Sequence, residues 1–148
     1  MKRIAKKYVD LSIGDPLPSF TISETQETIR NADLPIEGAG SFPRNIHTDA
    51  GFAKSGLFAG TVNAGIVTMA YINQMLEQWF PAKCFYNGGS LLFKAIKPFR
   101  PGDTVIFTGT ITAKRLEQDQ KLVECHIEGH NQSGTIVGVA DATLVFEE

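Results

Sequence analysis

Residues 61–80 constrain the fold more than any other part of the chain. Twelve of these twenty residues are apolar, and no charged residue occurs among them before Glu77. On a helical wheel the apolar positions cover most of the circumference, and a helix of this kind must be buried on most sides. Pro81 ends the pattern, because proline cannot continue a helix. The sequence therefore predicts one long, buried helix.

The spacing of the apolar residues changes from helical to alternating after this helix. In residues 122–130, for example, Val123, Cys125 and Ile127 alternate with glutamates and histidines. This period of two is typical of a strand with one buried face. Strands are predicted at residues 89–99, 104–113, 122–130 and 136–146, with short polar turns at 117–120 and 131–134.

A buried helix followed by these strands predicts an α+β fold, with a curled antiparallel sheet wrapped around one long central helix. Three of the strands are expected to form an antiparallel meander. A sheet of this kind leaves its edges and part of its concave face in need of cover, and a second copy of the chain would supply it by edge pairing. We therefore expect a homodimer or a higher homo-oligomer.

Shorter elements are expected before the long helix. Residues 8–13 are predicted as a short strand or extended lead-in, and residues 20–22 as a strand. A helix is predicted to begin after a cap at Ser23, with Gln26 reaching back to the cap, and to run to about Ala32.

A second short helix is predicted over residues 49–55, capped by Thr48 or Asp49 and ended at Gly56. Residues 34–43 between the two helices are rich in glycine and proline, and too little chain precedes them for an independent domain. We therefore expect residues 1–148 to form one domain with a long internal loop, which in compact domains is often functional.

The composition and the pattern of charged and apolar residues argue against several classes of protein. Fourteen Lys+Arg against sixteen Asp+Glu give a formal charge of -2, which argues against a general nucleic-acid binder. No apolar run reaches the length of about 18 residues that a membrane span needs. The basic cluster Lys2, Arg3, Lys6 and Lys7 is not followed by the apolar stretch of a secretory signal. We expect a solvated tail and a cytoplasmic location.

The two cysteines, Cys84 and Cys125, are too few for a disulfide scaffold or a four-cysteine zinc site. Both are expected to be free thiols that pack in the core. His126 and His130 share a strand face with Glu124 and Glu128, and we interpret this pattern as a solvated face with no metal site.

The region from Ser41 to Gly65 resembles the signature of the MaoC-like dehydratases and (R)-specific enoyl-CoA hydratases of the hotdog fold. The resemblance rests on Asn-Ile-His-Thr-Asp at 45–49, Phe-Ala-Lys at 52–54, Gly-Leu at 56–57 and the turn at 60–65. Residues 96–104, with their Pro-Gly-Asp, and the turn at 131–134 fit the same family. The similarity extends over residues 8–146.

The resemblance implies the addition of water across a 2-enoyl thioester, giving a (3R)-hydroxyacyl product, or the reverse reaction. A base must move protons, and donors must hold the thioester oxygen as it gains charge. By resemblance His47 is the base, and amides near Gly65 at the start of the long helix hold the oxygen. Asn63 would add a side-chain donor, and Asn45 would assist His47 or the substrate. No metal or other cofactor is implied.

The sequence departs from the family at one catalytic position. Hydratases of this family carry an aspartate where this chain has Phe42, and an Asn-Pro pair where it has Arg44 and Asn45. The loop before Phe42 is also longer than usual, and it carries Asp33 and Glu37. Three explanations stay open. Glu37 or Asp33 folds back as the acid, His47 acts alone or with Asn45, or the chain binds acyl thioesters without hydrating them.

Other residues are given structural interpretations. Asp49 is read as a helix cap, and the basic residues Arg44, Lys94, Lys97 and Arg100 as solvated in preference to binding the phosphates of coenzyme A. An acyl-CoA thioesterase is the remaining rival, but it needs a carboxylate on or near the long helix, which has none before Glu77. The expected ligand is an acyl-CoA or acyl-carrier thioester.

Overall fold

A computed structural model describes residues 5–33, 37–38 and 40–147. In chain order its elements are the short 3-10 helix η1 (Tyr8–Asp10), β1 (Phe20–Ser23), α1 (Gln26–Arg30), α2 (Ala50–Lys54), α3 (Gly65–Leu76), α4 (Lys83–Tyr86), β2 (Ser90–Ala95), β3 (Thr104–Glu117), β4 (Gln120–Asn131) and β5 (Ile136–Phe146). The basic residues Lys2 and Arg3 and part of the long loop lie outside the described residues. Among the described residues, no helix has the length and apolar character needed to cross a membrane.

Five strands form one antiparallel sheet in the order β1-β3-β4-β5-β2. The predicted meander is confirmed as β3, β4 and β5. The β3–β4 ribbon is longer than predicted, because residues 114–117 continue to pair with residues 120–123 up to a two-residue turn. Gln118 and Asp119 in that turn have positive φ angles of 48° and 67°, as tight hairpin turns of this type require.

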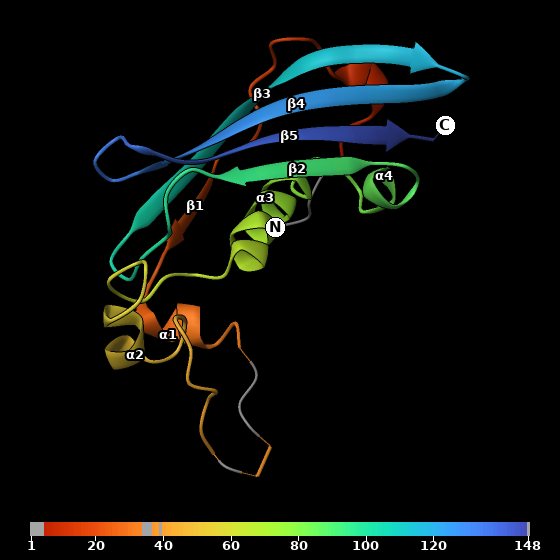
Figure 1. Ribbon diagram of the computed structural model, residues 1–148. Helices are drawn as coiled ribbons and strands as arrows, with labels where there is room; N and C mark the ends of the chain where they lie inside the picture. Colours follow the sequence, from red (N-terminus) through yellow and green to blue (C-terminus); the bar gives the residue numbers. More distant parts are fainter. Residues whose placement is uncertain (1–4, 34–36, 39, 148) are drawn as a thin grey trace.

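The sheet curves over α3, and α1 and α2 form a separate lobe beyond one end of it (Figure 1). The inner face of the sheet and one face of α3 share a single core. Its members from α3 are Tyr71, Ile72, Met75 and Leu76, and from the sheet they include Val105, Phe107, Ile111, Val123, Cys125, Ile127 and Leu144. The α+β fold and its central helix are as predicted.

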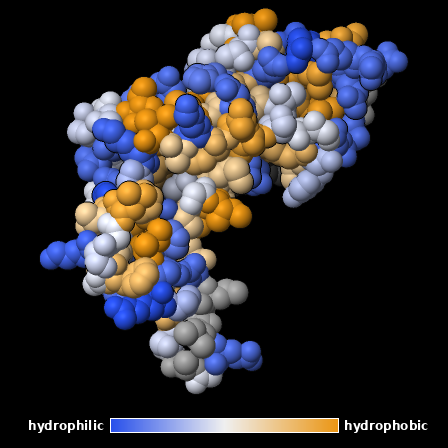
Figure 2. Space-filling view, viewed as in Figure 1, coloured by the Kyte–Doolittle hydropathy of each residue, from blue (hydrophilic) through white to orange (hydrophobic). Residues whose placement is uncertain are grey.

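Helix α3 is shorter and less buried than predicted. It begins at Gly65 because the preceding backbone pairs elsewhere: the amide of Val62 donates to the carbonyl of Ile46 (3.2 Å) and that of Asn63 to the carbonyl of Phe99 (2.8 Å). The sheet covers one face of α3, and Ile66 on the other side is 72% exposed. Apolar side chains also reach the surface under the sheet and over the α1–α2 lobe in the view of Figure 2.

The predictions for the N-terminal elements were partly wrong. Tyr8 to Asp10 form a 3-10 turn instead of a strand. Strand β1 is confirmed, but Ser23 is its last residue, and α1 is capped by Thr25, whose side chain accepts from the Thr28 amide at 3.0 Å. Ser23 is unavailable as a cap because it is paired with Thr104 of β3.

The predicted helix α2 is confirmed, with Asp49 as its cap. Helix α4 was not predicted, because only four residues between Pro81 and Gly88 adopt it and they leave no periodic pattern.

Candidate active site

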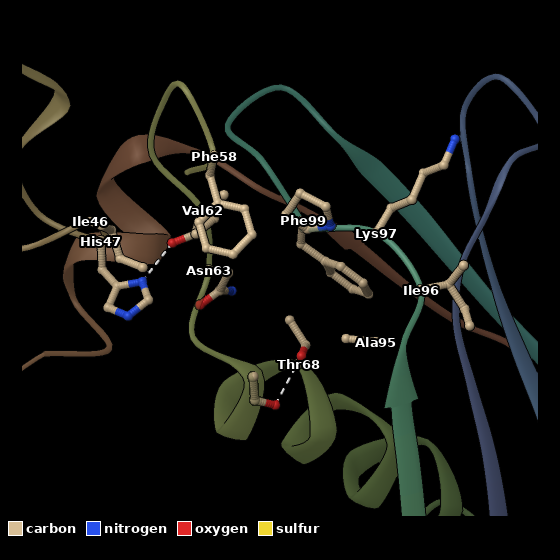
Figure 3. A pocket seen from close by; sticks show the side chains of 12 residues that line it. Ile46, His47, Phe58, Val62, Asn63, Thr68, Ala95, Ile96, Lys97 and Phe99 are labelled. Atoms are coloured by element: carbon tan, nitrogen blue, oxygen red, sulfur yellow. Dashed lines mark hydrogen bonds between the residues drawn. The ribbon is translucent and has the colours of Figure 1, made fainter. Parts of the chain in front are cut away.

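A cavity of about 370 Å³ opens where the α1–α2 lobe meets the start of α3 and the end of β2 (Figure 3). Most of its wall is apolar. It is lined by Ile46, His47, Phe58, Val62, Asn63, Gly65, Thr68, Ala95, Ile96, Lys97, Pro98 and Phe99. Three of the residues predicted from the sequence, His47, Asn63 and Gly65, therefore lie around one cavity.

The imidazole of His47 has a defined orientation. Its Nδ1 lies 2.7 Å from the carbonyl oxygen of Val62. Because a carbonyl can only accept, Nδ1 carries the proton in this bond and the neutral ring leaves Nε2 with a free lone pair. Figure 3 shows Nε2 on the side of the ring away from Val62. A neutral imidazole held in this tautomer can act as a base near neutral pH.

The backbone of His47 is also held on both sides. Its amide donates to Oδ1 of Asn45 at 2.7 Å, and its carbonyl accepts from Nε2 of Gln26 at 2.9 Å. Nδ2 of Asn45 in turn donates to Asp33 at 2.7 Å. Asn45 is not among the residues that line the cavity, so its contacts organise the loop that carries His47.

Gly65 is the first residue of α3, and the helix presents its N-terminal end to the cavity. The first amides that donate within the helix are those of Val67 and Thr68, which both bond to the carbonyl of Ala64. The Gly65 amide lies ahead of them, where helices leave donors unpaired and the dipole favours negative charge. A Cβ at Gly65 would meet no atom within 4 Å, so the helix terminus borders open space.

The side chain of Asn63 lines the cavity but is already engaged. Its Nδ2 donates to Oε1 of Glu24 at 2.7 Å and to the hydroxyl of Tyr71 at 3.0 Å, and its Oδ1 accepts from the Ala64 amide at 2.7 Å. Both amide hydrogens are therefore used within the protein. Burial, followed by the nearby charge of Glu24, raises the pKa of Tyr71 to about 12.

The structure does not bring Glu37 to the cavity. Glu37 is exposed and is not among the residues that line the cavity. Asp33 contacts Asn45 and not His47. Phe42, where the resemblance described above predicts an aspartate, lies with its ring centre 5.0 Å from the guanidinium of Arg30 and lines a different depression. The wall of the cavity contains no carboxylate among the described residues.

Two of the basic residues have structural contacts. Arg100 donates from Nη2 to the carbonyl of Phe58 at 2.6 Å and so holds Phe58 over the cavity. Arg44 pairs with Asp49 at 3.1 Å. Lys97 lines the cavity, but its ammonium group points away from Thr68 in Figure 3, and Lys94 is exposed on β2.

Asp49 caps α2 by accepting from the amide of Phe52 at 2.8 Å. This hydrogen bond is the largest cause that lowers the pKa of Asp49, and the charge of Arg44 adds to it. The sequence-based interpretation of Asp49 as a cap is confirmed.

The remaining titratable candidates lie elsewhere. Cys84 and Cys125 are free, buried thiols, and burial raises the pKa of both, that of Cys125 to about 12. His126 lies on the outer face of the sheet, with Nδ1 2.7 Å from Asp141. Within the described part of the chain, no group of three or more His, Cys, Asp or Glu residues is arranged to hold a metal ion.

Sequence reasoning missed several residues that build this site. Glu24 and Gln26 follow β1 and carry no periodic signal, and their contacts with Asn63 and His47 are long-range. Tyr71 and Thr68 were assigned only to the apolar helix. Phe58 lies between the shared elements of the region that resembles the family, and no feature of the sequence indicated that Arg100 would hold its backbone.

A sequence model of the MaoC like domain family matches residues 40–131. Comparison with curated proteins gives no match. Among solved structures, a MaoC-like dehydratase from Rhodospirillum rubrum is 26% identical; the match covers 93% of each chain, with a TM-score of 0.71. The (R)-hydratase PhaJ1 from Pseudomonas aeruginosa is 21% identical over 95% of this chain and 85% of its own, with a TM-score of 0.72.

An (R)-hydratase from A. caviae is 16% identical over 93% of this chain and 98% of its own, with a TM-score of 0.69. At these low identities the two (R)-hydratases show the shared hotdog fold. The family match includes the loop of His47, α3 and the strands β2, β3 and β4. Because it covers more than half of the sequence, this chain belongs to the MaoC-like domain family.

Proposed function

We propose that this protein is a hydratase or dehydratase of acyl thioesters that adds water to a 2-enoyl-CoA to give a (3R)-hydroxyacyl-CoA. The observation that carries this proposal is that a base and a helix N-terminus border the same cavity. His47 offers a free Nε2, and Gly65 offers an amide at the positive end of α3. Family membership and the structural similarity to (R)-hydratases support the same class of reaction.

His47 would act on the water molecule. Nε2 takes a proton as the water oxygen bonds to the β carbon of the enoyl group. The protonated ring then returns a proton to the α carbon from the same side, which makes the addition syn. The carbonyl of Val62, which holds Nδ1 in this geometry, becomes a stronger partner when the ring is charged.

The start of α3 would hold the thioester oxygen. Negative charge develops on this oxygen when water adds to the β carbon, and a fixed amide donor in a site with limited water stabilises it. Gly65 is suited to this role because it has no side chain to block the approach to its amide. We assign Asn63 and Asn45 to the support of these groups, since their amides already bond within the protein.

The apolar wall of the cavity would receive the acyl chain. Phe58, Ile96 and Phe99 are among the apolar residues that line it. The carrier of the thioester, coenzyme A or an acyl carrier protein, would extend out of the cavity mouth.

The lack of a carboxylate beside His47 favours a second candidate function, the binding of acyl thioesters without hydration. Phe42 cannot activate water, and the side chain of Glu37 is exposed outside the cavity. A thioesterase is less well supported, because no carboxylate of the described residues lines the cavity or projects from α3 before Glu77.

We further propose that the protein acts as a homodimer paired along β2, since β2 is a sheet edge and lies next to the open side of α3. Leu92 on β2 and Ile66 on α3 are both 72% exposed, which favours a second copy as their cover. The free, buried thiols of Cys84 and Cys125 are consistent with the reducing conditions of the cytoplasm.

One assay on the wild-type protein separates the three functions. Crotonyl-CoA is added, and the enoyl absorbance and the release of free thiol are followed together. Loss of absorbance without thiol, with (3R)-hydroxybutyryl-CoA as product, supports hydration. Release of thiol would instead identify a thioesterase, and binding of the thioester with neither change would identify the non-catalytic function.

A further inference from the structure

Glu24 is a buried carboxylate that the proposed reaction does not use. It follows the last residue of β1 and is only 2% exposed. It is the one acidic residue among the buried residues of the described chain, and none of the ion pairs between described residues includes it. A buried charge is costly unless hydrogen bonds compensate for its lost hydration, so the contacts of Glu24 are informative.

Those contacts lead directly to the wall of the cavity. Oε1 of Glu24 accepts from Nδ2 of Asn63 at 2.7 Å, and Oε2 accepts from Oγ1 of Thr28 at 3.1 Å. The backbone of Glu24 is fixed as well, because its amide donates to Asp103 and its carbonyl accepts from Gly102. Glu24 is therefore a rigid acceptor for Asn63.

This acceptor determines which way the Asn63 amide faces. A carboxylate can only accept, so it selects the orientation in which Nδ2 points to Glu24 and Oδ1 points to the amide of Ala64. Asn63 stands between the two groups that the proposed reaction needs. The residue before it, Val62, holds Nδ1 of His47, and the residue after it, Ala64, is the N-cap of α3.

We propose that Glu24 is a positioning residue. It acts through Asn63 to fix residues 62–65, and therefore the Val62 carbonyl and the start of α3, relative to the imidazole of His47. It does not line the cavity and does not touch substrate. This inference rests on the proposed function and extends it with a residue from outside the recognised motif. The positioning depends on the hydrogen bond that Glu24 accepts from Asn63 more than on the charge of Glu24, because this bond fixes the orientation of Asn63 within residues 62–65.

Three substitutions at Glu24 separate the contributions of its hydrogen-bond acceptor, its charge and its side-chain length. Glu24→Leu removes the acceptor. Glu24→Asp keeps the charge but is one methylene too short for Asn63. Glu24→Gln keeps an oxygen for Asn63 and turns its amide hydrogens toward the Thr28 hydroxyl, which can accept them.

The expected result on crotonyl-CoA is a split between kcat and KM. Glu24→Leu and Glu24→Asp lower kcat by at least about tenfold with KM changed by less than about threefold, because small displacements of reacting groups are costly. Glu24→Gln stays within about threefold of the wild type in both. If Glu24→Leu does not fold, the comparison of Glu24→Asp with Glu24→Gln decides the matter.

A matched control separates positioning from loss of stability. Ile29 on α1 is fully buried and takes no part in the hydrogen bonds of Asn63, so Ile29→Ala lowers Tm without removing the acceptor. We expect its kcat, per folded molecule, to stay within about threefold of the wild type, because core packing alone does not set the turn. A fall in kcat that matches that of Glu24→Leu at equal Tm would overturn the proposal.

A second readout does not depend on hydratase activity. The imidazole ¹⁵N and ¹H resonances of His47 report the proton on Nδ1 that bonds to Val62. We expect Glu24→Leu to shift these resonances toward those of a free imidazole and Glu24→Gln to leave them in place. Unchanged His47 resonances in Glu24→Leu would overturn the role of Glu24. If Glu24→Leu shows the expected shift but the wild type does not hydrate crotonyl-CoA, only the proposed function is refuted.

Discussion

At the scale of single residues, the site depends on which hydrogen-bond partner each polar group finds. His47 lies with Nδ1 on a backbone carbonyl, so the protein itself selects the tautomer that leaves Nε2 free. Many catalytic histidines are oriented by a carboxylate, but here the Val62 carbonyl does this. In the proposed mechanism Phe42 cannot activate water, but the orientation of His47 does not depend on that position, because the Val62 carbonyl sets it.

A substitution at Glu37 tests whether the long loop before Phe42 supplies an acid to the proposed reaction. Because Glu37 is exposed and outside the cavity, we expect Glu37→Gln to hydrate crotonyl-CoA at a rate within about threefold of the wild type. General acid–base groups contribute roughly a hundredfold or more. A hundredfold loss in Glu37→Gln, with Glu27→Gln unaffected as the control, would show that the loop folds over the cavity and that Glu37 is the acid.

His126 gives the outer face of the sheet a small pH dependence. The hydrogen bond to Asp141, followed by its charge and by Glu128, raises the pKa of His126 above its ordinary value of 6.5. A raised pKa stabilises the folded state below the unfolded pKa, and this contribution is lost as pH rises through the folded pKa. The side chain is 42% exposed, so the effect stays below about 1 kcal/mol.

Urea unfolding between pH 5.5 and 8 measures this effect. We expect the wild type to lose the stabilisation from the His126–Asp141 contact as pH rises, so that its free energy of unfolding falls. Asp141→Asn lacks this stabilisation even at low pH. Glu117→Gln, which removes an exposed carboxylate elsewhere on the sheet, is the control. Equal pH profiles for the wild type and Asp141→Asn would contradict the assignment.

At the scale of elements, periodicity predicted what depends on local pattern. The strands and α3 follow from apolar spacing, because each has one face against the core. Residues 61–64 misled that reasoning. They are uncharged and include Val62 and Ala64, but the amides of Val62 and Asn63 bond to the carbonyls of Ile46 and Phe99. Glu24 had no signal at all, since its role arises from contact with Asn63, 39 positions away. Long-range pairing of this kind leaves no trace in local sequence.

The wall of the cavity is supported from the sheet. Phe99 stacks on Phe107 with ring centres 6.0 Å apart, and Phe107 fills the space above Gly129 of β4. A Cβ at Gly129 would lie 2.7 Å from the Phe107 ring and 3.3 Å from Val105. The glycine is therefore needed for close approach of the aromatic ring.

Gly129→Ala should destabilise the protein by roughly 1–3 kcal/mol, the usual cost of overpacking a core. The urea midpoint, with an unchanged slope, measures this loss. Gly65→Ala is the matched control, because its added methyl group meets no atom within 4 Å. A Gly129→Ala variant as stable as Gly65→Ala would show that Phe107 moves freely and that the wall is not rigid.

At the scale of the whole molecule, one copy of the chain leaves its central helix half covered. The sheet covers one face of α3, while β2 remains an edge strand and Ile66 and Leu92 are exposed. If β2 paired antiparallel with β2 of a second copy, related by a two-fold axis, the pairing would remove the free edge of β2 and help to cover the open face of α3. The axis would pass near the middle of β2, so that Leu92 meets its equivalent.

Light scattering during size exclusion tests this arrangement. We expect a mass twice the 16.2 kDa of the chain, and a shift toward the single-chain mass for Leu92→Asp, because like charges across paired strands repel. Leu116→Asp, at an exposed position on β3, should not change the mass. A wild type that elutes with the mass of one chain would contradict pairing along β2.

The central claim is that Nε2 of His47 acts on water in the cavity at the start of α3. The most direct test is the rate of crotonyl-CoA hydration by His47→Ala and the wild type, at equal concentrations of folded protein. We predict a loss of at least about a hundredfold, the lower end of what a general base contributes. A rate for His47→Ala within about threefold of the wild type would contradict the claim and remove His47 from the mechanism.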